Sequence, residues 1–442
     1  MVATIVITFG VSLVFSRLTN NFKNEYGGSY NYTKKLNNKH FSFFVGWNQY
    51  VQGPILASSS PLFLASAISD FLPTKVYWIV SAISMILFII LVLVSTMGLK
   101  LNKYVVLVSG IVKWLILLAA FVIVVYLAIT NHNSVSSSTG DSTTTYLIFS
   151  NIISFMYAFG GIEDVSAMSN DVKFKNFRKI IMVAFAFILT FYFIFYIVLV
   201  FAGKGFFSEH KNFANIFKAG LGTTGIWIFF VGILFNGISA KISIAVATSR
   251  KIVPLANDGF LFSFLTRKNN KGEFKNAIWF SAVITVLSMV VFYLIPTFLH
   301  KENFFESVIE LGSVAFLLQY FLTFLVAFIL EKKKIISKIP VWEKIVYVLA
   351  MAIIFSALMV FLFPVIVGKK WEEENTIILV SYFVFIGLGY LFKFISKKFN
   401  EWSLKKENTK LKKGYSENNI LSFEKENSEK SPLPLEIENA TN

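Results

Sequence analysis

One stretch within an apolar segment, residues 156–164, reads Met156-Tyr157-Ala158-Phe159-Gly160-Gly161-Ile162-Glu163-Asp164. Two adjacent glycines and two carboxylates therefore lie partway along an otherwise hydrophobic helix. The glycines weaken the helix and free backbone N–H and C=O groups, and in lipid each freed group needs another partner. Breaks of this kind form substrate sites near the membrane midplane of transporters. The alternative is a close helix crossing at small residues, in which Glu163 forms a structural ion pair.

The composition of the whole chain indicates a membrane protein. Of its 442 residues, 55% are hydrophobic and only 15% are charged, whereas soluble globular domains are about a quarter charged. The apolar content also excludes a disordered chain. The absence of cysteine excludes disulfides, thiol catalysis and cysteine-bound metals. The four histidines argue against a multi-histidine metal site, so we expect neither a metal nor a cofactor.

The chain contains eleven apolar stretches that are candidate membrane spans, because a spanning helix needs about 20 mostly apolar residues. They are approximately residues 1–16, 42–70, 76–96, 104–129, 145–169, 179–203, 222–248, 276–299, 303–330, 341–367 and 375–396. The sequence therefore predicts an all-α polytopic membrane protein with one transmembrane domain over residues 1–396. The polar remainder, residues 397–442, is expected to be a disordered cytoplasmic tail.

The distribution of basic residues predicts the orientation in the membrane. The chain has 41 Lys and Arg and a formal net charge of +16. When the loop at residues 17–39 is placed in the cytoplasm, most of these basic residues fall in cytoplasmic loops and in the tail, as the positive-inside rule requires. The C-terminus is then cytoplasmic and the N-terminus is outside. The basic charge thus reflects topology in the cell membrane rather than binding to nucleic acid.

Two lysines lie inside predicted spans. Lys113 is nine residues past Tyr104, roughly 14 Å deep at the rise of an α-helix, which is too deep for easy snorkelling. It could carry a proton or replace a bound cation, or it could pair permanently with backbone carbonyls. Lys241 is closer to the inner face, and we expect its ammonium group to snorkel toward the headgroups.

Sequence motifs of enzymes are absent. There is no GxxxxGK[ST] phosphate loop, HExxH or GxSxG motif. A polytopic membrane enzyme usually clusters His, Asp or Arg at one membrane face. The segment 250–275 has basic residues but no His, and its only acids are Asp258 and Glu273. We therefore expect a protein that is not an enzyme.

Four motifs resemble those of the amino acid–polyamine–organocation (APC) permeases, in the same order and at similar spacing over residues 1–396. They are Gly27-Gly28-Ser29-Tyr30-Asn31-Tyr32 with Gly46-Trp47, similar to the GGxYxY…GW connection after the family's second helix; Gly160-Gly161-Ile162-Glu163 with Asn170-Asp171-Val172-Lys173, similar to its broken sixth helix; Ser249-Arg250-Lys251-Ile252-Val253-Pro254-Leu255-Ala256-Asn257-Asp258-Gly259, similar to its SR-x5-A-x-DG signature; and Leu318-Gln319-Tyr320, where its tenth helix carries a tyrosine.

The resemblance implies a LeuT-type fold of two inverted five-helix repeats with two trailing helices, and secondary transport of amino acids or related amines by alternating access. It implies that the break binds the substrate through Tyr157, Ala158, Phe159, Gly160 and Gly161, with Tyr157 closing over it. It further implies a role in coupling or gating for Glu163. A lysine like Lys113 often replaces a sodium ion in this family, which favours proton coupling or exchange.

The start of the chain departs from the family pattern. The family usually has twelve transmembrane helices, and its first helix, with a GSGIF-type break that grips the substrate carboxylate, has no counterpart in residues 1–442. Arg17 also occupies a position where the family usually has an acidic residue. One interpretation is that the true start lies upstream. The other is a truncated remnant or sensor that does not transport.

Overall fold

The computed structural model describes residues 2–23, 25–68, 74–130, 144–171, 176–209, 213–294 and 305–429. Every element within these ranges is helical, which confirms the predicted all-α polytopic class. The longer helices are α1 (Val2–Asn21), α3 (Lys39–Ile68), α4 (Thr74–Ser95), α5 (Leu99–Thr130), α6 (Thr145–Met156), α8 (Phe177–Glu209), α9 (Phe213–Asn257), α10 (Lys275–Met289), α12 (Phe305–Lys332), α13 (Val341–Leu362) and α14 (Glu373–Glu429). The shorter ones are α2 (Ser29–Lys34), η3 (Tyr157–Phe159), α7 (Ile162–Ala167), η4 (Ser169–Asp171), η5 (Ser263–Thr266), the π-helical η6 (Val290–Leu294) and η7 (Pro364–Val367).

Within the described residues, 8 helices are long and apolar enough to cross a membrane. They are α1, α5, α8, α9, α10, α12, α13 and α14. The other three predicted spans correspond to α3, to α4 and to the interrupted α6–η3–α7 segment. The apolar described parts of the last two, Ala82–Ser95 and Thr145–Phe159, are shorter than a full span. Parts of the predicted spans 42–70, 276–299 and 303–330 lie outside the described residues.

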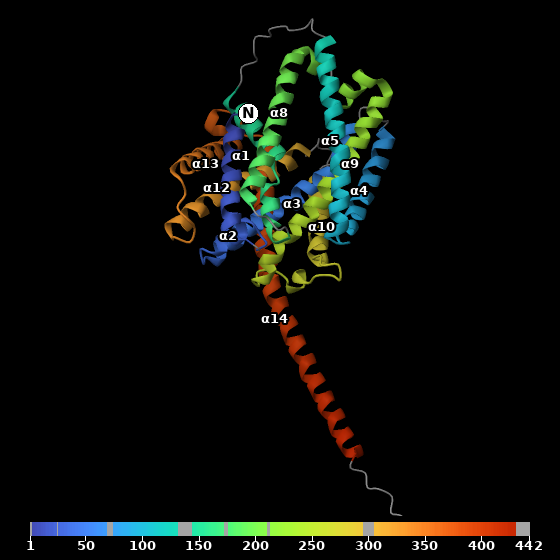
Figure 1. Cartoon of the computed structure of the whole chain (residues 1–442), viewed down its shortest axis with the longest axis vertical. Helices are drawn as coiled ribbons and strands as arrows, with labels where there is room; N and C mark the ends of the chain where they lie inside the picture. The colour runs from blue at the N-terminus through green and yellow to red at the C-terminus, as the bar shows by residue number, and fades with distance from the viewer. Residues whose placement is uncertain are drawn as a thin grey trace, which may run out of the picture.

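The helix α3 lies at the centre of the helical body, where it packs against α4, α9, α10 and α12 (Figure 1). On one side of it, α1 packs against α8, α12 and α13. On the other side, α5 packs against α8 and α9. The two parts of the interrupted helix lie against these long helices: α6 packs against α12 and α13, and α7 packs against α1 and α9.

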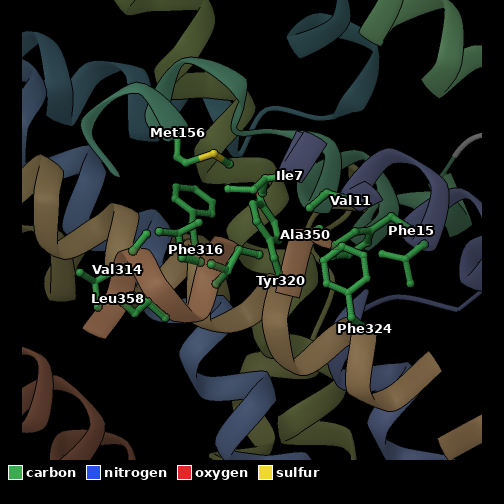
Figure 2. Packing of buried hydrophobic residues seen from close by; sticks show 14 of the residues in the cluster. Ile7, Val11, Phe15, Met156, Val314, Phe316, Tyr320, Phe324, Ala350 and Leu358 are labelled. Atoms are coloured by element: carbon green, nitrogen blue, oxygen red, sulfur yellow. The ribbon is translucent and has the colours of Figure 1, made fainter. Parts of the chain in front are cut away.

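The largest hydrophobic cluster joins α1 to α12 and α13 (Figure 2). On α1, the buried residues Ile7, Val11 and Phe15 follow a four-residue spacing, which places them on one helix face. Tyr320 and Phe324 of α12 have the same spacing and face them. The rings of Phe15 and Tyr320 meet edge to face, with centroids 6.1 Å apart. This packing places the hydroxyl-bearing face of α12 next to the break.

The first helix is longer than predicted. The apolar pattern places its end near residue 16, but α1 continues to Asn21. Within this longer helix, Arg17 forms an ion pair of 2.8 Å with Glu343 of α13. Arg178 contacts the other oxygen of the same buried carboxylate at 2.8 Å. The ion pair with Glu343 compensates the charge of Arg17, whose side chain is largely buried.

Apolar side chains also cover the outer helix faces. On α5, for example, Leu107, Leu115 and Val122 are all more than half exposed. A stripe of large exposed apolar residues is expected where a helix contacts lipid chains.

The last helix, α14, does not end where the apolar sequence ends. It continues through the polar segment after residue 396 as far as Glu429, and in Figure 1 this part projects away from the other helices. The described part of the segment 397–442 is thus helical, whereas the sequence predicts a disordered tail. The division of the chain into a permease domain and a cytoplasmic tail stays a prediction.

Candidate functional site

The helix that begins at Thr145 breaks at the two adjacent glycines. Its first part, α6, ends at Met156 and is followed by the single turn η3, Tyr157–Phe159. Gly160 is extended, and Gly161 has a φ of 118°. Only glycine adopts such a φ readily. The helix then resumes as α7 with Ile162. The expected break is therefore present, and the Gly160-Gly161 pair is its cause.

Glu163 is fully buried in the first turn of α7. Its Oε1 accepts a hydrogen bond of 2.9 Å from the backbone N–H of Gly161. Its Oε2 accepts one of 2.8 Å from the hydroxyl of Tyr320 on α12. No ion pair joins Glu163 to a basic side chain within the described ranges, which argues against the structural ion pair considered from the sequence. Both oxygens are nevertheless partnered, as a buried carboxylate requires.

The residues predicted to bind substrate lie along the break. Tyr157 and Gly160 are exposed, whereas Phe159 is buried and packs with a ring-centroid distance of 5.3 Å against Tyr192 of α8. The hydroxyl of Tyr192 donates to the carbonyl of Ala158 at 3.3 Å. The break is therefore accessible at Tyr157 and Gly160, whereas Ala158 and Phe159 are held in place by Tyr192 of α8.

Lys113 lies elsewhere. It is on α5, which is well separated from α12 in Figure 1, and it is partly exposed. The two predicted coupling residues, Glu163 and Lys113, are thus not brought together in the structure. The hydrogen-bond partners of Glu163 are Gly161 and Tyr320. Among the described residues, no hydrogen bond or ion pair is formed by Lys113.

The acidic residue next to Glu163 connects the break to α9. Asp164 forms an ion pair with Lys251, whose side chain is buried. The two adjacent carboxylates of α7 therefore face different helices, Glu163 toward α12 and Asp164 toward α9. The sequence placed Lys251 inside a family signature but did not indicate this pairing.

The neighbouring residue of that signature, Arg250, is also buried and joins two further acids. Its Nε lies 2.7 Å from Oδ2 of Asp171 in η4, and its Nη1 lies 2.6 Å from Oε2 of Glu273. The hydroxyl of Tyr26 donates to Asp171 as well. Burial, with the charge and hydrogen bond of Asp171, raises the pKa of Tyr26 to about 12.

A third connection involves Asp258, at the end of the signature. Its Oδ1 pairs with the ammonium of Lys34 on α2 at 2.6 Å, and its Oδ2 accepts a hydrogen bond from Tyr30. Burial and the neighbouring Asp258 raise the pKa of the Tyr30 phenol. Arg250 and Asp258 of the signature thus bind the segment after the break and α2, respectively, to the end of α9.

The prediction for Lys241 is wrong. Its ammonium does not snorkel to the membrane surface. The side chain is only 7% exposed, and Nζ donates a hydrogen bond to the carbonyl of Ala57 on α3. No group of three His, Cys, Asp or Glu side chains suited to a metal ion occurs within the described part of the chain.

Comparison with known proteins places the chain in a family. The amino acid permease family profile matches residues 1–389. The uncharacterized protein MG225 of Mycoplasma genitalium is 37% identical over 413 residues, covering 86% of this chain and 84% of that protein. The uncharacterized MG226 homolog of Mycoplasma pneumoniae is 32% identical over 431 residues, covering 86% and 84%. MG226 of Mycoplasma genitalium is 31% identical over 440 residues, covering 90% and 89%. The chain is a multi-pass membrane protein that belongs to the amino acid permease family, a family of transporters.

Proposed function

We propose that this chain transports amino acids across the cell membrane by alternating access, with the break between α6 and α7 as its substrate site. Membership of the amino acid permease family supports amino acid transport. The observation that carries the proposal is the geometry of the break. Two glycines interrupt an apolar helix, and the two carboxylates that follow bind to different helices, α12 and α9.

The backbone at the break supports recognition of an amino acid. The carbonyl ends of α6 and η3 carry a partial negative charge, which suits the ammonium group of the substrate. Tyr157 and Gly160 are exposed at this point, and Ala158, Phe159 and Gly161 complete the cradle. In this proposal Tyr157 covers the bound substrate.

The two ionic contacts of α7 suggest how substrate binding is linked to movement. While Asp164 is paired with Lys251, α7 is tied to α9. Reorientation of α7 relative to α9 breaks this pair. Glu163 is the proposed coupling group, because a proton on Oε2 turns an acceptor of the Tyr320 hydrogen bond into a donor. Lys113 is a second candidate for charge compensation on α5, and the coupling is to protons or to exchange.

The proposed topology follows from the charge distribution and from the family. The positive-inside pattern supports a cytoplasmic C-terminus. The order of helices and the position of the break support an inverted-repeat arrangement of the LeuT type. Accessibility of single introduced cysteines to a membrane-impermeant reagent tests the orientation directly, because the chain contains no native cysteine.

The central experiment is uptake by the purified chain in proteoliposomes. We expect accumulation of one or more labelled amino acids above that of empty vesicles, with a rate that changes between pH 5 and pH 8. The variant Glu163→Gln should lose this pH dependence. The variant Glu372→Gln is the matched control, since that acid pairs with Lys369 at the protein surface. Folded protein that takes up no amino acid, under either a proton gradient or an exchange condition, contradicts the proposal.

A further inference from the structure

A lysine is enclosed between four helices, away from the substrate site. Lys241 of α9 lies beside a cavity of about 20 Å³ bounded by α3, α4, α9 and α10. The cavity is large enough for a single water molecule. Among the described residues that line it, three carry hydroxyl groups, Thr248, Ser281 and Thr285, and none is an Asp or Glu. The ring of Phe88 lies 5.4 Å from the ammonium nitrogen.

The hydrogen-bond acceptor of Lys241 has a specific origin in the sequence. Nζ donates to the carbonyl of Ala57 at 2.5 Å. In an α-helix that carbonyl normally accepts from the N–H four residues later, and the residue in that position is Pro61, which has no N–H. Proline in the middle of α3 therefore leaves a carbonyl without its usual donor, and Lys241 supplies the donor from the neighbouring helix.

The same two helices touch at a second point, one helical turn away along α3 and two turns away along α9. A Cβ atom on Gly53 of α3 would lie 2.3 Å from the hydroxyl oxygen of Thr248 on α9, so only glycine permits this approach. The contacts Gly53–Thr248 and Ala57–Lys241 together fix how far α9 is displaced along α3. Thr248 is followed closely in sequence by Lys251, which holds Asp164 at the break.

We propose that Lys241 is a positioning residue for transport, which replaces the backbone donor that Pro61 removes from α3 and thereby sets the position of Lys251 relative to Asp164. The part of this inference that concerns transport rests on the proposed function. The part that concerns the pairing of Lys241 with the proline-freed carbonyl does not.

A double-mutant cycle in thermal stability tests the pairing. Lys241→Met removes the donor with little change in length and should lower the Tm by about 1–3 °C, because a carbonyl that loses its donor is costly in the protein interior. Pro61→Ala restores a backbone N–H to the carbonyl of Ala57. In the background of Lys241→Met it should recover roughly half of the loss or more.

Pro54→Ala is the matched control, because Pro54 is in the same helix and also lines the cavity but frees the carbonyl of Tyr50 instead. It should not rescue Lys241→Met. If Lys241→Met does not fold alone, the test compares two double variants, Lys241→Met with Pro61→Ala and Lys241→Met with Pro54→Ala. The measured quantity is then the yield of monodisperse protein, which should be higher with Pro61→Ala. Equal rescue by both proline variants, or rescue by neither, overturns the inference.

Uptake kinetics test the positioning role separately. Per folded molecule, Lys241→Met should lower the maximal uptake rate roughly tenfold and leave the half-saturating substrate concentration within about twofold, because the substrate site itself is intact. Pro61→Ala should restore the rate. An unchanged maximal rate overturns the positioning role, whereas the absence of uptake by the unmodified chain contradicts the proposed function and leaves the stability cycle as the test of the pairing.

Discussion

The hydroxyl of Tyr320 donates a hydrogen bond of 2.8 Å to the buried carboxylate of Glu163. The two residues are 157 positions apart in the sequence, one on α12 and the other immediately after the helix break. Gly161 donates to the second oxygen of the same carboxylate. A single acid therefore links the broken backbone to a neighbouring helix, and in the proposed function this link responds to a proton or to substrate.

Removing the hydroxyl tests this link. We expect Tyr320→Phe to reduce amino acid uptake about tenfold or more, because a hydrogen bond to a charged group contributes about 1.5–3 kcal/mol and Glu163 would keep a buried oxygen without a partner. The measurement is initial uptake per folded molecule in proteoliposomes. Tyr347→Phe is the control, since that hydroxyl donates to Glu343 at a distance from the break. Equal rates for the unmodified chain and Tyr320→Phe would contradict the assignment.

A second prediction concerns the backbone of the break. Gly161→Ala should destabilise the protein by about 1–2 kcal/mol, because its φ of 118° is unfavourable for a residue with a Cβ atom. A Cβ atom at this position would meet no other atom within 4 Å, so the cost is backbone strain and not a steric clash. Gly387→Ala is the control: it also has open space around its Cβ position but lies within the regular helix α14. A stability loss no larger for Gly161→Ala than for Gly387→Ala, measured by thermal unfolding, would refute the argument.

The break and the fold class follow from local sequence, but the pairing of charges does not. Adjacent glycines predict an interruption wherever they occur in an apolar helix, and hydropathy predicts helices. The ion pair between Arg17 and Glu343 joins residues 326 positions apart, so the apolar pattern ended the first helix too early.

The case of Lys241 is similar. A lysine near the end of a span can snorkel or be buried, and only the packing of α9 on α3 decides between the two. One signal was present in the sequence. Pro61 leaves a backbone carbonyl without its helical donor, and a buried donor on another helix is one way to satisfy it.

The buried acid between two arginines gives a third prediction. Glu343→Gln should lower stability by about 3 kcal/mol, the lower end of the range for breaking a buried pair, because Arg178 is partly exposed to solvent. The measurement is thermal unfolding in the same detergent. Glu372→Gln is a suitable comparison, since that acid is half exposed, pairs with the partly exposed Lys369 and should have an effect of at most about 1 kcal/mol. Similar losses for both variants would show that the central carboxylate has no special role.

The ion pair between Asp164 and Lys251 provides a fourth prediction. Asp164→Ala and Lys251→Ala should each reduce uptake, and the exchanged pair Asp164→Lys with Lys251→Asp should recover part of the rate, because the attraction is retained when the charges are reversed. The corresponding exchange of Lys369 and Glu372, an exposed pair 3.3 Å apart, should change uptake little. If the uptake rate of the exchanged pair does not exceed that of either single variant, the attraction between these two charges is not required for transport.

The raised pKa of Tyr26 predicts a loss of stability in alkaline solution. Its phenol has a pKa of about 12 in the folded protein, because it is buried and donates to Asp171, against an ordinary value of 10. The neutral form is therefore favoured by folding, so its contribution is complete below pH 10 and is lost as the pH rises toward 12. Lysines also titrate in this range, so the informative quantity is a difference. The Tm of the unmodified chain should exceed that of Tyr26→Phe at pH 9 by more than it does at pH 11. A difference in Tm between the two proteins that is the same at both pH values would show that the phenol does not make this contribution.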